Sequence, residues 1–179
     1  EPPYVPLLDL DVARHQGGWG RIRNVNNQLA KFSPEKILPD DWEIVKWNEE
    51  PPIRTHHTFE KVSLFLELEK RNVFFSEPMD LDFAMISAYP DAYSVEQSDP
   101  DETILKAVLG KSHHNPAQYT AAEQLLFGTY HSKFKLGSKP AAHISALAKL
   151  TDEELLDNLP PSLNRMADAI IAALEDIPE

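Results

Sequence analysis

Short apolar runs alternate with helix-like segments over the first 90 residues, and this alternation constrains the fold more than any other feature. The apolar runs cover 5–8, 42–47 and 73–75. Between them, the apolar spacing and the proline breaks predict helices over 22–32 and 59–70. The order strand, helix, strand, helix, strand is typical of a parallel α/β unit.

Beyond residue 90 only helical patterns follow. The segment 90–101 is polar, acidic and bounded by prolines, so we expect a boundary there. Thr120 and Thr151 are each followed three residues later by a glutamate, the spacing of a capping box. Apolar residues at helical spacing predict a last helix over 162–176. The expected fold is therefore an α/β parallel sheet flanked by helices, with an additional helical subdomain.

Composition narrows the classes of function. The 179 residues carry a formal charge of −12 and no cysteine. Excess negative charge disfavours broad nonspecific binding of nucleic acid, and the lack of cysteine excludes disulfides and thiolate zinc sites. No apolar run approaches the roughly 18 residues of a membrane-spanning helix, and no signal-like start precedes the first strand. We therefore expect a cytoplasmic protein.

Two groups of acidic residues follow the first and the last of the predicted strands. In open parallel sheets, ligands sit at the carboxyl ends of strands. Carboxylates gathered there repel each other unless a cation lies between them, and a hard ion such as Mg²⁺ is the natural occupant. Asp9 and Asp11 are two residues apart, so on an ideal strand both point to one face. The candidate metal ligands are Asp9, Asp11, Ser76, Glu77, Asp80 and Asp82.

Both groups also have a purely structural interpretation. Asp9 and Asp11 are solvated loop residues if the strand ends before them. Asp80 or Asp82 caps the helix predicted from Phe83, where a carboxylate favours the positive helix end. Spacing by itself leaves both alternatives open.

Basic side chains gather in two places. Arg14, Arg21 and Arg23 flank the glycine-rich turn that follows Asp11. The second group contains Lys133, Lys135 and Lys139, with His131 and His143. Lys139 stands at a predicted helix start, where the helix dipole disfavours a cation. Such a placement indicates a role in pairing with a phosphate or with the acidic residues.

Three ordered segments together resemble a known family. Residues 5–14, with Gly17, Gly18 and Arg21, resemble the DxD segment of a Toprim domain. The resemblance is closest to the carboxyl-terminal nuclease region of the class 2 OLD (overcoming lysogenization defect) family. Residues 72–83 are similar to that family's next strand and acidic loop, and residues 136–143 to its late lysine segment.

The resemblance implies a metal-dependent DNA endonuclease. It implies a Toprim-like catalytic core over 1–90, a helical insertion over 91–138, and a late lysine segment with carboxyl-terminal helices over 139–179. A catalytic glutamate stands upstream of the DxD in this family, so we expect the amino-terminal part of the core to be missing from this sequence. The family joins this region to an ABC-type ATPase domain that also dimerises, and the present sequence contains no Walker A motif.

The resemblance also implies roles for particular residues. Asp9 and Asp11 would hold one or two Mg²⁺ ions, or Mn²⁺, and the acidic loop would supply ligands to a second ion. Lys139 would neutralise charge on the phosphate during cleavage. Arg14 and Arg21 would position the DNA backbone.

Two other functions fit parts of the sequence. A haloacid-dehalogenase-like phosphatase also has a DxD after a strand, with Asp9 as the nucleophile. Ala13 stands where a hydroxyl residue would follow in such an enzyme. A non-enzymatic interaction module would use the acidic loops to bind a partner protein, and it predicts no affinity for divalent ions.

Overall fold

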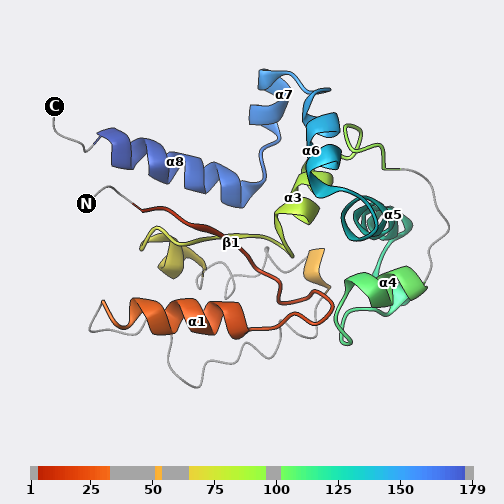
Figure 1. The fold of residues 1–179 in the computed structure, drawn as a ribbon, viewed down its shortest axis with the longest axis horizontal. Coiled ribbons are helices and arrows are strands. Elements are labelled where there is room, and N and C mark those ends of the chain that lie inside the picture. The colour runs from red at the N-terminus through yellow and green to blue at the C-terminus, as the bar shows by residue number, and fades with distance from the viewer. Residues whose placement is uncertain (1–3, 33–50, 54–64, 96–101, 176–179) are drawn as a thin grey trace.

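The computed structural model describes residues 4–32, 51–53, 65–95 and 102–175 (Figure 1). Within these ranges the architecture is mixed α/β and rich in helix. Along the chain the named elements are β1 (Leu7–Asp9), α1 (Gly20–Leu29), β2 (Phe74–Ser76), α3 (Leu81–Ala88), α4 (Glu102–Val108), η3 (Pro116–Gln118), α5 (Ala121–Tyr130), η4 (His131–Lys135), α6 (Lys139–Leu147), α7 (Asp152–Asp157) and α8 (Pro161–Glu175).

The sheet of the described residues consists of β1 and β2, which pair in parallel. Leu7 lies opposite Phe74, and Asp9 lies opposite Ser76. The expected parallel arrangement is therefore confirmed for these two strands. The strand predicted over 42–47 lies outside the described residues. The helix predicted over 59–70 is described only from residue 65, and residues 65–69 are helical.

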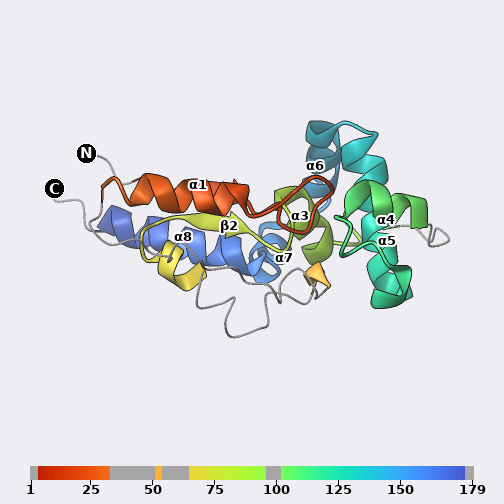
Figure 2. The ribbon, with the colours of Figure 1, turned by 90° about the horizontal axis from the view of Figure 1, so that it is seen from below.

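Helices cover both sides of the strand pair. In Figures 1 and 2, β1 and β2 run between α1 and α8. The first hydrophobic cluster lies here, and its members come from β1, α1, β2 and the helix at 65–69. Leu10, Ile22 and Leu68 are fully buried in it. This cluster fixes the direction of β1 and therefore the place where its acidic residues emerge.

Helix α1 ends at Leu29, three residues before its predicted end. The backbone amides of Lys31 and Phe32 donate to the carbonyls of Gln28 and Leu29, so the chain leaves the helix in a turn. Phe32, at the predicted end of this helix, therefore lies beyond α1, and its side chain is 89% exposed.

A second hydrophobic cluster holds α3, α4, α5 and α6 together at the other end of the molecule (Figure 2). Phe83 of α3 lies 5.0 Å from Phe127 and 5.8 Å from Tyr130, measured between ring centroids. Thr120 and Thr151 form the two predicted capping boxes at α5 and α7. Helix α8 confirms the prediction of a last helix.

The loop after β1 connects the two clusters. The amide of Asp11 donates to the carbonyl of Met79 at 2.6 Å, and the amide of His15 donates to Val108 at 2.7 Å. Gly110 donates in turn to the carbonyl of Ala13. The first of these bonds holds the DxD segment against the acidic loop that follows β2, and the other two hold the following turn against the end of α4. Within the described ranges, no helix is long and apolar enough to cross a membrane.

Candidate acidic site

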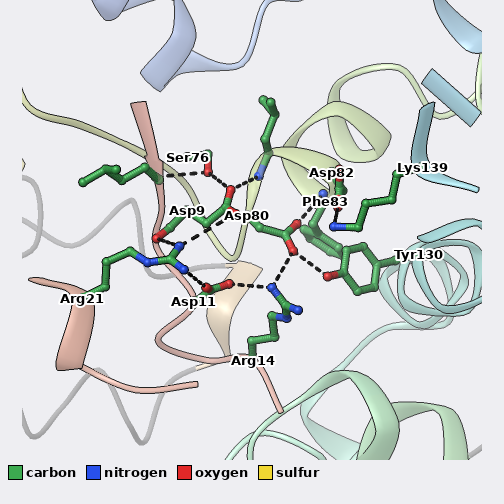
Figure 3. A network of polar contacts seen from close by, with 12 residues as sticks. Asp9, Asp11, Arg14, Arg21, Ser76, Asp80, Asp82, Phe83, Tyr130 and Lys139 are labelled. Atoms are coloured by element: carbon green, nitrogen blue, oxygen red, sulfur yellow. Dashed lines mark hydrogen bonds and ion pairs between the residues drawn. The ribbon is translucent and has the colours of Figure 1, made fainter. Parts of the chain in front are cut away.

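Asp9 is held at the carboxyl end of β1 by groups from the neighbouring strand and helix. The Ser76 hydroxyl donates to Asp9 Oδ1 at 3.1 Å, as expected from their opposed positions in the sheet. The backbone amide of Leu81 donates to the same oxygen at 3.2 Å. Asp9 therefore joins β1 to the end of β2 and to the start of α3 (Figure 3).

Asp11 lies beyond the end of the strand, in the left-handed region with φ of 57°. The strand-alternation argument for Asp9 and Asp11 does not apply here, because β1 ends at Asp9. The turn that follows is tight. A Cβ on Gly17 would stand 1.8 Å from the carbonyl oxygen of Asp11, so only glycine fits there.

Asp80 is the N-cap of α3 and is also part of the site. Its Oδ1 accepts from the amide of Phe83 at 2.9 Å, which confirms the capping interpretation. Its Oδ2 accepts from the Tyr130 hydroxyl at 2.5 Å and from Arg14 at 3.4 Å. The residue is 1% exposed. Burial raises the pKa of Asp80, and the Tyr130 and Phe83 donors act in the opposite direction.

Two guanidinium groups join these carboxylates, as Figure 3 shows. Arg14 Nη1 lies 2.9 Å from Asp11 Oδ1 and 3.4 Å from Asp80 Oδ2. Arg21 lies 2.9 Å from Asp11 Oδ2 and 3.8 Å from Asp9 Oδ2. We call Asp9, Asp11 and Asp80 the acidic site. Its three carboxylates come from the two strand ends and share two cations.

Asp82 belongs to a neighbouring cluster with the late lysine. Lys139, the first residue of α6, pairs with Asp82 Oδ2, and His143 Nε2 lies 3.0 Å from Asp82 Oδ1. The Tyr93 hydroxyl lies 2.6 Å from His143 Nδ1. Burial, with a smaller effect of Asp82, raises the pKa of Tyr93 to about 12. The expected pairing of Lys139 with an acidic residue is thus present, two residues along the chain from Asp80.

Glu77 contacts a different part of the molecule. It lines a pocket of about 550 Å³ together with Phe65, Pro78, Pro161 and Arg165. Arg165 lies 3.9 Å from Glu77 and pairs more closely with Glu69, at 2.8 Å. Burial raises the pKa of Glu77 to about 7. The structure therefore groups Glu77 with Arg165 and not with Asp9, Asp11 or Asp80.

The raised pKa of Glu77 makes stability depend on pH. The folded protein holds this proton up to about pH 7, whereas the ordinary value is 4.5. The free energy of unfolding is therefore expected to fall as pH rises between these values, by on the order of 3 kcal/mol. Glu77→Gln removes this ionisable group. The free energy of unfolding, measured in urea across this pH range, should then change less with pH than in the wild type. Glu153→Gln, at an exposed position, is the control and should retain the wild-type slope. An unchanged profile in Glu77→Gln would contradict the assignment.

Tyr130 is the residue of this site that sequence patterns did not indicate. It is fully buried, and its hydroxyl donates to Asp80 from 50 residues away. Its position at the end of an apolar helix resembles that of any core aromatic residue, so no local signal marks it.

The donor chemistry of the acidic site fits a hard divalent ion. Carboxylate oxygens are the ligands that Mg²⁺ and Mn²⁺ prefer, and here the positive charge between them comes from Arg14 and Arg21. Across the described ranges, no group of three or more histidine, cysteine or acidic residues stands ready to hold a metal ion. Binding would therefore require the guanidinium groups to withdraw from the carboxylates.

A hollow of about 590 Å³ gives access to this site. It is lined by Asp11, Gly17, Arg21 and Asn24, among others. Asp11 and Arg21 therefore border a space that a ligand can enter.

Comparison of the chain with protein-family models, curated proteins and solved structures gives no significant match. Function is therefore inferred from the geometry of the acidic site and from the segment resemblance.

Proposed function

We propose that this chain is the catalytic part of a metal-dependent DNA endonuclease with a Toprim-like core. The observation that carries the proposal is the bridge made by Arg14 between Asp11 and Asp80. Carboxylates from two distant segments of the sequence converge on one cation, and this convergence supports a place for a divalent ion once the guanidinium groups withdraw. The three similar sequence segments support the same function.

In this proposal each group has a defined task. Asp9, Asp11 and Asp80 hold Mg²⁺ or Mn²⁺, and Ser76 orients Asp9 through its hydrogen bond. A divalent ion held there would supply positive charge to stabilise the oxygens of an in-line phosphodiester displacement. Lys139 neutralises charge on the phosphate from the start of α6. Asp82 holds the Lys139 ammonium and is not a ligand in this scheme.

Arg14 and Arg21 supply the positive charge that a DNA backbone needs near the acidic site. Such phosphate contacts fix position and carry no sequence information. This local charge reconciles DNA binding with a formal charge of −12 for the whole chain. The proposed partners are DNA and an ABC-type ATPase domain in the same polypeptide, through which the protein dimerises.

Ion binding and cleavage test the proposal together. Calorimetric titration with MgCl₂ and MnCl₂ should show binding that Asp9→Asn weakens by at least about 10-fold, because a ligand is lost. Asp9 is partly exposed, so this variant is expected to fold. In the intact polypeptide that the resemblance implies, supercoiled plasmid should be cut with either ion and left intact with a chelator.

Three results would contradict the proposal. A chain with no affinity for divalent ions would favour the interaction module. Hydrolysis of phosphate monoesters through a phosphoaspartate at Asp9 would favour the phosphatase. Ion binding that Asp9→Asn leaves unchanged would place the ion elsewhere.

A further inference from the structure

Helix α5 continues into a π-helical turn, η4, and this turn changes the direction of its last lysine. The amide of Leu136 donates to the carbonyl of His131 at 3.1 Å, five residues back. In an uninterrupted α-helix, a residue five positions after Tyr130 would be rotated away from it by about 140°. In a π-turn the backbone hydrogen bonds join residues five positions apart, so two such residues lie on more nearly the same side of the helix. Lys135 is therefore brought to the side of the helix that carries Tyr130.

The contacts of Lys135 agree with this geometry. Its Nζ lies 6.0 Å from the centroid of the Tyr130 ring, within the range of a cation–π contact. The hydroxyl of the same ring donates to Asp80. One aromatic ring therefore separates the Lys135 ammonium from the acidic site.

The charges around Lys135 are those of the proposed catalytic centre. Partial burial lowers the pKa of Lys135, Arg14 and Lys139 act in the same direction, and Asp80 and Asp11 oppose them. Lys139 is already paired with Asp82. Much of the Lys135 side chain is nevertheless exposed, and it makes no ion pair with any residue that the structure describes. Its ammonium is thus available to an anion that approaches the site.

We propose that Lys135 is a second phosphate-binding cation and that the site takes a ligand with at least two neighbouring phosphates. A polynucleotide backbone has this character, and a phosphomonoester does not. The inference rests on the proposed function, since it identifies Lys135 as a contact to the same DNA. Lys139 binds one phosphate of the backbone, and Lys135 binds the adjacent phosphate.

Lys133 provides a matched control on the same π-turn. It lines a separate hollow with Tyr93, Ser94 and Lys149. Lys133→Met therefore removes an equal charge from the same element, away from the Tyr130 ring.

Salt dependence of DNA binding tests the inference on the full chain. Wild type, Lys135→Met, Lys135→Arg and Lys133→Met are titrated onto fluorescent duplexes of two unrelated sequences with CaCl₂ present. Lys135→Met should weaken binding equally for both sequences and reduce the slope of log K against log salt by about 1. Lys135→Arg should restore the slope, and Lys133→Met should match the wild type. Thermal melting checks that all four chains are folded.

The outcomes separate this inference from the proposed function. A reduced slope in Lys135→Met without any plasmid cleavage would support the phosphate contact and count against the nuclease. Plasmid cleavage with equal slopes in Lys135→Met and Lys133→Met would overturn the phosphate contact alone. Failure of Lys135→Arg to restore the slope, or no binding of DNA by the wild type, would also overturn it.

Discussion

Asp11→Asn is expected to lower ion-dependent plasmid cleavage by at least about 100-fold, because it removes a carboxylate that the proposed ion site needs. Asp11 is the residue on which both Arg14 and Arg21 converge. The amide keeps the size of the side chain but loses its negative charge. Nicking of supercoiled plasmid by the intact polypeptide with MgCl₂ or MnCl₂ measures the effect.

Asp168→Asn is the matched control for this loss. It makes the same chemical change at an exposed position of α8, and cleavage should stay at the wild-type rate. Circular dichroism of both variants shows whether the fold is kept. Wild-type cleavage by a folded Asp11→Asn chain would exclude Asp11 from the site and remove the main support for the proposal.

Phe83→Ala is expected to lower the free energy of unfolding by about 3–5 kcal/mol. Phe83 is fully buried, and its ring stacks on Phe127 and meets the edge of Tyr130. Removal of the ring leaves a cavity beside the backbone amide that donates to Asp80. Urea unfolding followed by circular dichroism measures the change.

Phe32→Ala makes the same substitution at a side chain that is 89% exposed. Its effect should stay within about 0.5 kcal/mol, as for most surface changes. An equal loss of unfolding free energy in Phe83→Ala and Phe32→Ala would contradict both the burial of Phe83 and the exposure of Phe32.

Several local features of the fold could be predicted from the sequence. The capping boxes at Thr120 and Thr151 were predictable because each is complete within four residues. The strands at 7–9 and 74–76 follow from short apolar runs, and their parallel order follows from the alternation of strands and helices between them. The acidic residues beside these strand ends were therefore candidates before any contact was known.

Other predictions failed because the periodic pattern in the sequence continues beyond the residue at which the helix or strand ends. Apolar spacing extended the first helix to Phe32, three residues past its end at Leu29, because periodicity does not show where a helix ends. Strand alternation grouped Asp9 with Asp11, yet they share Arg21 through a turn that needs Gly17. The proximity of Asp9 and Asp11 was therefore predicted, but from a strand alternation that does not extend to Asp11.

The residue pattern by itself determined the short elements, their caps and the position of the acidic residues at the strand ends, since these depend on interactions within one or two turns of chain. Packing of distant segments decided which acidic residues meet. Asp80 joins Arg14 and Tyr130, whereas Glu77, three residues earlier, lies with Arg165. Such long-range contacts depend on how the two hydrophobic clusters dock, and local spacing carries no information about that docking.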